Sequence, residues 1–399
     1  MNEGDRMAHE NSKAMTSSER VRTTLAHREP DRIPLDLGST KMTGISIKAY
    51  RNFIAHKGWQ DLEPEPVILD PVQQLALVRE PVLEKLGVDT RGLLPAAPAG
   101  FQAAYREENG YVRFTDEWGV AWKMPKTGGH YFDMTAHPLI GDIGEPDLDR
   151  FAWPDPRDAT RTAAFRGRVT ELRQAGDYGL VMHGVSAGIL EMALRLRGFE
   201  QLFMDFALEP DLVCGLLDRL VEIKSAFWET ALDQVGADVL VAIEADDLGS
   251  QDSLLISPEM YRRFVLPRHK RLFSFIKRKA PHIKVFLHSC GAIRPLIPDL
   301  IEAGVDILNP VQVSARGMDP KALKKDFGDV LTFWGGGIDT QHVLPFGSPD
   351  EVRDEVKRRI DELAPGGGFI FNTIHNIQAD VPPRNLEAML DTFEQQATY

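Results

Sequence analysis

The chain has 399 residues, 43% of them hydrophobic and 26% charged, which suits a globular protein with a large buried core in one barrel or two domains. The formal net charge of −13 repels phosphate backbones and anionic bilayers, which argues against nucleic-acid binding. Two cysteines and the lack of a long uninterrupted apolar stretch predict a cytoplasmic protein that does not span a membrane.

The N-terminal part of the sequence predicts a tail, a helix and a short strand. Residues 1–16 are polar and lack the basic and apolar blocks of a signal peptide, so we expect a mobile tail ahead of a single domain over 17–399. A helix is expected over 17–27 and a strand over 32–38. Residues 40–154 are rich in proline and glycine and are predicted to elaborate the entrance, with Asp116 to Trp122 favouring a hairpin over an aromatic lid.

From about residue 180 onward, a short apolar run, a turn and a long amphipathic stretch recur several times. The predicted strands cover residues 180–183, 238–243, 284–288, 307–311, 331–334 and 369–371. The predicted helices include residues 210–235, 258–279, 293–303 and 349–363. Strands separated by helices imply a parallel sheet. Because no Gly-x-Gly-x-x-Gly pattern opens a helix after the first strand, the α/β class predicted here is a closed TIM (β/α)8 barrel with an N-terminal elaboration rather than an open doubly wound sheet.

A histidine and a cysteine stand together at the end of one predicted strand. His288 and Cys290 follow an apolar run, and alternation in a strand places both on one face. His375 follows another apolar run, so imidazole, thiolate and a second imidazole can bind Zn²⁺ where the two strand ends meet. Three protein ligands leave one coordination position open, which indicates catalysis. The alternatives are a buried cysteine beside a hydrogen-bonded histidine, or a free nucleophile activated by His288, for which no third partner is evident.

Other polar residues also follow predicted strands, where a barrel carries its chemistry. Alternation puts Glu244 and Asp246 on one face and Asp247 on the other. Glu244 and Asp246 are the candidate catalytic acids. One of these carboxylates could serve as a fourth metal ligand, as a partner of His288 or as a general acid. The alternative is that the cluster merely faces solvent. The candidate substrate-binding residues are His183, Asp247, Gln251, Asn309 and Asp339.

Three segments carry a family resemblance. They are His288-Ser289-Cys290-Gly291, Asp246-Asp247-Leu248-Gly249 and Val381-Pro382-Pro383-Arg384-Asn385. With them the chain resembles the uroporphyrinogen decarboxylase superfamily from about residue 17 to the C terminus. It looks more like the cobalamin-linked methyltransferase branch, typified by methylcobalamin:coenzyme M methyltransferase, than like the decarboxylase. The resemblance implies a TIM barrel.

The sequence also departs from both branches of this family. The decarboxylase motif Arg-Gln-Ala-Gly-Arg-Tyr, whose arginines receive substrate carboxylates, is replaced by Ile-Pro-Leu-Asp-Leu-Gly at residues 33–38. In the methyltransferases a His-x-Cys pair and a later cysteine bind zinc. His288 and Cys290 match the pair, but His375 takes the later cysteine's place, which makes the site less electron-donating. A substrate other than coenzyme M, such as an oxygen or nitrogen compound, is therefore left open.

The leading functional prediction is a zinc-dependent methyltransferase that moves a methyl group between a small molecule and a corrinoid or tetrahydrofolate carrier. The chain has no Asp-x-His-x-x-Gly sequence typical of a cobalamin-binding module, so a corrinoid is expected on a separate partner protein. The oligomeric state is left open, with a homodimer as one option. One alternative is a decarboxylase or carbon–carbon lyase acting on a small acid. Another is a binding or regulatory protein that has lost turnover.

Overall fold

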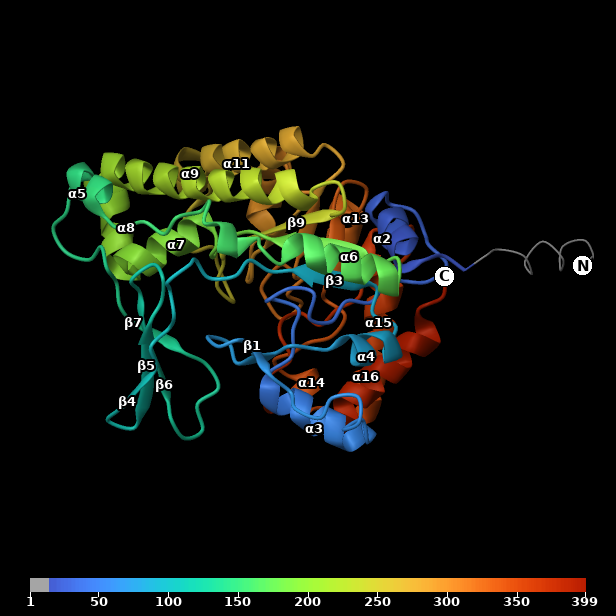
Figure 1. Ribbon diagram of the computed structural model, residues 1–399. Coiled ribbons are helices and arrows are strands. Elements are labelled where there is room, and N and C mark those ends of the chain that lie inside the picture. Colours follow the sequence, from blue (N-terminus) through green and yellow to red (C-terminus); the bar gives the residue numbers. More distant parts are fainter. Residues whose placement is uncertain (1–13) are drawn as a thin grey trace, which may run out of the picture.

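The computed structural model describes residues 14–399, and its centre is a curled parallel sheet (Figure 1). The strand order is β13-β12-β11-β10-β9-β8-β3. In chain order these strands are β3 (Thr90–Leu93), β8 (Gly179–His183), β9 (Val241–Ala245), β10 (Lys284–His288), β11 (Ile307–Asn309), β12 (Thr332–Trp334) and β13 (Phe369–Ile370). Most of their residues are apolar and buried, as expected for parallel strands covered on both faces.

Residues 34–36 fill the eighth position and close the sheet. Leu35 forms a parallel bridge with Phe371, and the amide of Asp36 donates to the Phe371 carbonyl at 2.9 Å. On the other side, the amide of Asp89, next to β3, donates to the Leu35 carbonyl at 2.8 Å. The segment therefore lies between β13 and β3, and the predicted TIM barrel is confirmed.

One helix covers the N-terminal end of the barrel. Val21 and Leu25 of α2 (Ser17–Leu25) belong to the same apolar cluster as the barrel-interior residues Val181, Ile243 and Trp334. A Cβ atom on Gly179 would lie 2.8 Å from Val21 Cγ2, so the helix approaches the barrel closely. Thr16 caps this helix, whereas most of the predicted tail, residues 1–13, lies outside the described residues. The opposite end, formed by the carboxyl ends of the strands, is left as the mouth.

Helices surround the barrel, and the boundaries predicted for two of them agree with the structure. These two are α9 (Pro210–Val235) and α15 (Pro349–Leu363). The other helices are α3 (Ile47–Lys57), α4 (Glu80–Lys85), α5 (Glu145–Arg150), α6 (Phe165–Ala175), α7 (Ile189–Arg197), α8 (Phe199–Leu208), α10 (Pro258–Met260), α11 (Leu266–Lys279), α12 (Ile297–Ala303), α13 (Pro320–Phe327), α14 (Val343–Phe346) and α16 (Pro383–Gln396). The 3-10 helices η1 (Ala159–Arg161) and η3 (Arg294–Leu296) and the π-helix η2 (Tyr261–Val265) accompany them. Within residues 14–399, no helix is both long enough and apolar enough to cross a membrane.

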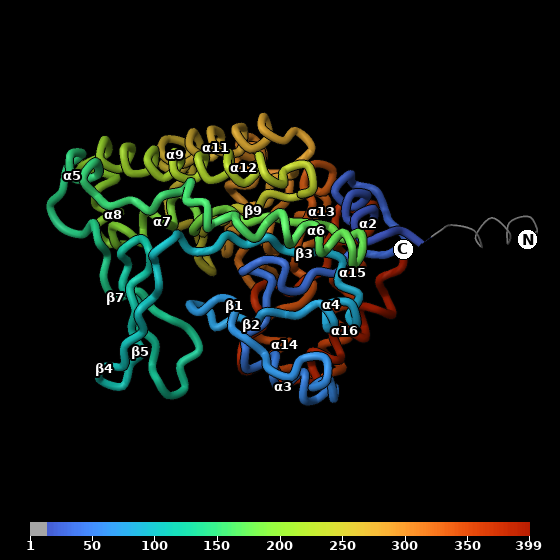
Figure 2. Tube along the Cα trace, viewed as in Figure 1, coloured from blue at the N-terminus to red at the C-terminus, as the bar shows by residue number. Residues whose placement is uncertain are grey.

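A four-stranded antiparallel sheet stands away from the barrel at the end opposite the two termini (Figures 1 and 2). Its strands are β4 (Arg106–Glu108), β5 (Tyr111–Thr115), β6 (Ala121–Pro125) and β7 (Asp133–Ala136). β5 and β6 form the predicted hairpin, whose turn is held by Asp116 Oδ1 accepting from the amides of Trp118 and Val120. Trp118 and Trp122 are buried, so they form the hydrophobic side of this sheet rather than a lid.

Residues 40–154, grouped as an elaboration in the sequence analysis, in fact contain one barrel strand. β3 has the sequence Thr-Arg-Gly-Leu, which lacks the apolar run by which the other strands were found. The strand is nevertheless buried. Its arginine tolerates burial because Arg91 Nη1 donates to the carbonyls of Val88 and Thr90, and Arg91 Nε donates to Glu80. The rest of the segment includes the antiparallel pair β1 (Ile68–Asp70) and β2 (Leu75–Ala76), helices α3 to α5 and the four-stranded sheet.

Candidate functional site

The structure brings His288, Cys290 and His375 together at the barrel mouth. One potential ligand atom from each lies within 4.8 Å of the others, and His288 Nε2 is 3.4 Å from Cys290 Sγ. Zinc bonds of about 2.0 Å to nitrogen and 2.3 Å to sulfur at a tetrahedral angle place the two donors about 3.5 Å apart. The donor atoms and the measured pair distance therefore fit a zinc ion.

Asn309 holds His288 in the orientation that a metal ligand needs. Its Oδ1 lies 2.5 Å from His288 Nδ1, and its own Nδ2 donates to the Trp334 carbonyl at 2.7 Å. Because the amide oxygen can only accept, His288 carries its proton on Nδ1 and presents the lone pair of Nε2 towards Cys290. Asn309 was predicted to bind substrate, whereas here it is fully buried and contacts the histidine instead.

Two glycines allow the loop that carries Cys290 to pack against the loop that follows β9. A Cβ atom on Gly291, which has a φ of +92°, would lie 2.5 Å from the carbonyl carbon of Gly249. The amide of Gly291 also donates to Gln312 Oε1, and Gln312 Nε2 donates to Gln251 Oε1. Gln251, a predicted substrate ligand, therefore supports the loop that carries Cys290 through Gln312.

Burial shifts the pKa of two of the three candidate ligands, Cys290 and His375. Burial raises the pKa of the Cys290 thiol, and the carboxylates of Asp247 and Glu191 raise it further. Burial lowers the pKa of His375 to about 3, with His288 adding to the effect. His375 therefore stays neutral at physiological pH and can donate to a metal, whereas Cys290 needs a bound cation to become a thiolate.

The predicted acid Glu244 points away from the mouth, into the helix layer. Its Oε2 lies 2.8 Å from Lys224 Nζ, and its Oε1 accepts from Trp228 Nε1 at 2.6 Å. Both partners lie on α9, and both charged side chains are almost fully buried. The expected catalytic role of Glu244 does not fit this geometry, because neither oxygen faces the ligand group.

Asp246, the second predicted acid, is also used for structure. Its two oxygens accept from the amides of Leu190 and Glu191 at the start of α7, and Oδ2 lies 3.0 Å from His269 Nε2. The side chain is fully buried. Glu244 and Asp246 do share a face of the chain, as predicted, but that face carries the helices, since Val241 and Ile243 occupy the barrel interior.

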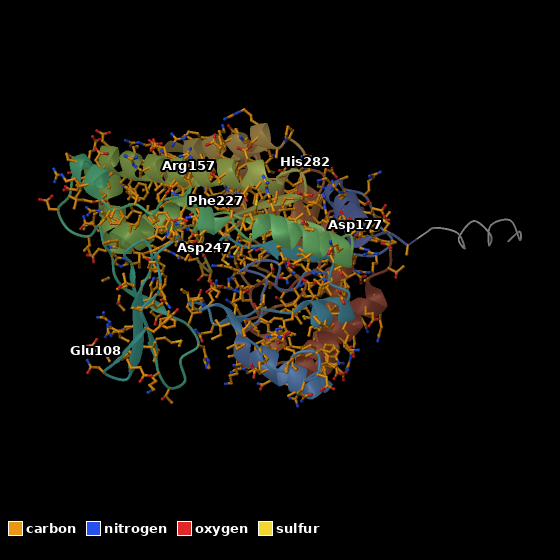
Figure 3. The ribbon with its side chains drawn as sticks, in the orientation of Figure 1. Glu108, Arg157, Asp177, Phe227, Asp247 and His282 are labelled. Atoms are coloured by element: carbon orange, nitrogen blue, oxygen red, sulfur yellow. The ribbon has the colours of Figure 1, made fainter. Side chains whose placement is uncertain are left out.

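Asp247 is instead the acid that lies beside the metal-ligand group. Its Oδ1 accepts from the amide of Cys290 at 2.8 Å and lies 3.9 Å from His288 Nε2. Its side chain is 43% exposed, and it lies on the side of the barrel that faces the four-stranded sheet (Figure 3). A carboxylate in this position can contact both the ligands and an incoming substrate.

The two remaining predicted residues, His183 and Asp339, form hydrogen bonds with loop residues. His183 ends β8, and its Nε2 accepts from the amide of Lys41 at 3.3 Å; burial, followed by Lys41, lowers its pKa to about 3. Asp339 accepts from the amides of Gln341 and His342 in the loop after β12. His183 therefore remains a residue of the mouth, whereas Asp339 stabilises a loop.

Several charged residues near the mouth were missed by the sequence analysis. Lys41 Nζ lies 3.0 Å from Asp70 Oδ2, and Arg195 Nη2 lies 2.5 Å from Glu191 Oε1. Burial raises the pKa of Tyr131, in the loop between β6 and β7, to about 12; Arg195 opposes this shift, and Asp70, Glu191 and Asp247 add to it. Only Lys41 lies in a loop that follows a barrel strand, so the search for polar strand ends could not find the others.

Replacing Asn309 by alanine is expected to weaken zinc binding by about 10- to 100-fold, because His288 loses the acceptor that fixes its tautomer. Asn309→Asp keeps an acceptor at the same place and should retain most of the affinity. Competition with a chromogenic chelator measures both variants. Equal affinities for Asn309→Ala and the wild type would show that the hydrogen bond does not position the histidine.

The chain is similar in sequence to known proteins with two different activities, a methyltransferase and a decarboxylase. The chain is 27% identical over 258 residues to methylated-thiol–coenzyme M methyltransferase of Methanosarcina mazei, a match that covers 64% of this chain and 65% of that relative. It is 24% identical over 289 residues to uroporphyrinogen decarboxylase of Alkalilimnicola ehrlichii, covering 70% of this chain and 73% of that one. The chain thus spans slightly less than two thirds of the methyltransferase.

A solved structure and a family model agree with the barrel. A methyltransferase from Methanosarcina mazei superposes with a TM-score of 0.64 at 17% identity, covering 96% of this chain and 99% of that one, which supports the fold. The family model described as uroporphyrinogen decarboxylase (URO-D) matches residues 130–396, well over half of the chain. The chain therefore belongs to the uroporphyrinogen decarboxylase family.

Proposed function

We propose that the protein is a zinc-dependent methyltransferase that moves a methyl group between a small molecule and a corrinoid or folate carrier. The observation that carries the proposal is the convergence of His288, Cys290 and His375 at the mouth of the barrel. The similarity to a methyltransferase of Methanosarcina mazei supports it. A catalytic zinc with three protein ligands supplies an open position at which a thiol or hydroxyl loses its proton near neutral pH.

Each residue of the site has a separate part in this reaction. His288, oriented by Asn309, and the neutral His375 present imidazole nitrogens, and Cys290 presents sulfur. Asp247 lies beside Cys290 with an exposed side chain and can contact the incoming substrate. In the transfer, the sulfur or oxygen of the acceptor bonds to the methyl carbon, and the proton of the acceptor is released to solvent. The bond between that carbon and the carrier atom breaks, and its electron pair stays on the carrier.

The methyl carrier is proposed to reach this mouth on a partner protein if it is a corrinoid. The 399 residues contain no Asp-x-His-x-x-Gly sequence that would bind cobalamin. A folate carrier would instead diffuse to the site as a small molecule. Turnover with free methylcobalamin or with methyltetrahydrofolate as the methyl donor distinguishes the two carriers.

Replacing His375 tests the metal site itself. His375→Ala removes one of three ligands, so the zinc content should fall from about one ion per chain to a small fraction, and methyl transfer should fall with it. His375→Cys supplies a thiolate and should retain zinc. His342→Ala is the matched control, because the His342 side chain is 71% exposed and contacts Asp339. Elemental analysis of an active wild type that contains no zinc would refute the proposal.

A second candidate is a decarboxylase or carbon–carbon lyase acting on a small acid. The similarity to uroporphyrinogen decarboxylase of Alkalilimnicola ehrlichii favours it. This activity would proceed without a methyl carrier. Release of carbon dioxide from small carboxylic acids by the purified protein, in the absence of any corrinoid or folate, would favour this candidate.

A further inference from the structure

The charges around the metal ligands bear on which substrate the site accepts. Asp247 is the solvent-accessible carboxylate next to the ligands, with Oδ1 2.8 Å from the Cys290 amide nitrogen. Among the described residues, no hydrogen bond or ion pair engages its other oxygen, Oδ2. In the part of the chain that the structure describes, no lysine or arginine forms an ion pair with Asp247, so a substrate that approaches Cys290 meets a carboxylate without a basic side-chain partner.

The cations near the mouth already have partners. Arg195 pairs with Glu191 at 2.5 Å and lies over the ring of Trp122, with its guanidinium carbon 5.4 Å from the ring centroid. Lys41 pairs with Asp70 at 3.0 Å. Each of these side chains would have to give up or share its carboxylate before it could receive an anionic group of a substrate.

The neighbourhood of Cys290 and Tyr131 is dominated by acids. Asp247 Oδ1 lies 2.8 Å from the Cys290 amide nitrogen, and Glu191 Oε1 lies 2.5 Å from Arg195 Nη2. Besides burial, Asp70, Glu191 and Asp247 raise the pKa of Tyr131, against Arg195. A sulfonate or carboxylate near the reacting atom would be repelled here, whereas an ammonium group would be attracted.

We propose that Asp247 makes the site selective for small substrates whose group next to the reacting atom is neutral or cationic, and that it disfavours sulfonates and carboxylates. The inference rests on the proposed function and deepens it by naming the substrate class. It also separates this protein from an enzyme that methylates coenzyme M, whose thiol is linked to a sulfonate.

Three thiols that share a two-carbon spacer test this selectivity. They are 2-aminoethanethiol, 2-mercaptoethanol and 2-mercaptoethanesulfonate, with free methylcobalamin as the methyl donor. We expect the wild type to show a kcat/KM for the amine about tenfold or more above that for the sulfonate, with the alcohol between them. In each transfer the carbon–cobalt bond breaks with its electron pair left on cobalt, the sulfur–carbon bond forms, and the thiol proton is released.

Asp247→Asn isolates the contribution of the carboxylate charge. The variant keeps an oxygen that can accept from the Cys290 amide but removes the negative charge. The thiols differ in acidity, which affects kcat/KM equally in the wild type and the variant. The decisive quantity is therefore the amine-to-sulfonate ratio of kcat/KM in the variant divided by the same ratio in the wild type. This ratio should fall several-fold in Asp247→Asn and stay unchanged in the control Asp361→Asn, which alters an exposed carboxylate on α15.

Binding to the cobalt-substituted protein ranks the same thiols without turnover, through the thiolate-to-cobalt charge-transfer band. A wild type that binds or methylates the sulfonate best, or a ratio that Asp247→Asn leaves unchanged, would overturn the inference while leaving the methyltransferase intact. Absence of methyl transfer with all donors, together with the expected ranking in binding, would instead refute the proposed function and retain the selectivity of Asp247.

Discussion

Replacing Cys290 by serine is expected to abolish zinc binding and methyl transfer together. The thiolate is the only sulfur in the ligand group, and a serine hydroxyl is a poor zinc ligand near neutral pH. Loss of a Lewis acid that contributes several kcal/mol corresponds to a decrease of kcat/KM on the order of 10³-fold or more. Zinc content by elemental analysis and turnover with methylcobalamin measure the two effects.

The second cysteine provides a matched control for this experiment. Cys214 lies on α9, is half-buried like Cys290, and contacts Arg268 through its backbone carbonyl. Cys214→Ser should keep the zinc content and the activity of the wild type. If Cys290→Ser retained both, Cys290 would not be a metal ligand, and the proposed chemistry would fail.

Replacing Lys224 by methionine is expected to destabilise the protein by about 3–5 kcal/mol, because it leaves the carboxylate of Glu244 buried without its cation. Lys224 Nζ lies 2.8 Å from Glu244 Oε2 and also donates to the Val185 carbonyl. The midpoint of urea unfolding should fall accordingly. Adding Glu244→Gln removes the orphaned charge but keeps an acceptor for Trp228, so the double variant should regain part of the lost stability.

The same pair of variants decides whether Glu244 is structural or catalytic. With the contacts seen here, Glu244→Gln should lower the free energy of unfolding, while the folded protein keeps most of its kcat. A large loss of kcat in a variant of normal stability would restore the catalytic role predicted from the sequence. Unchanged stability in both Lys224→Met and Glu244→Gln would show that the buried pair contributes nothing.

Local sequence signals were sufficient for much of the fold. The start of α15 follows from the capping box of Ser348 and Glu351 and from Pro349 at the first helical position. The apolar runs located most barrel strands, but not β3, whose buried arginine and glycine hide it. Such a strand is recognised only once its neighbours are in place, because the buried guanidinium of Arg91 then pairs with Glu80 and lies over the ring of Tyr178.

The sequence by itself determined the candidate metal ligands and the end of the barrel at which they lie. His288, Cys290 and His375 each follow a strand, and the carboxyl ends of parallel strands meet at one mouth. It also determined that Glu244 and Asp246 share a face that Asp247 does not.

Only the tertiary structure decided which of those faces lines the mouth. β9 is buried on both faces, so both sets of alternating residues are largely apolar. The hydrophobic pattern therefore does not indicate which face points into the barrel and which faces the helices. The direction is fixed by packing: Lys224, Trp228 and His269 from α9 and α11 take the carboxylates on one face, and Asp247 is left to the ligands. The partner of His288 and the pair Lys41–Asp70 were decided in the same way, because they come from segments that are distant in sequence and meet only when the barrel closes.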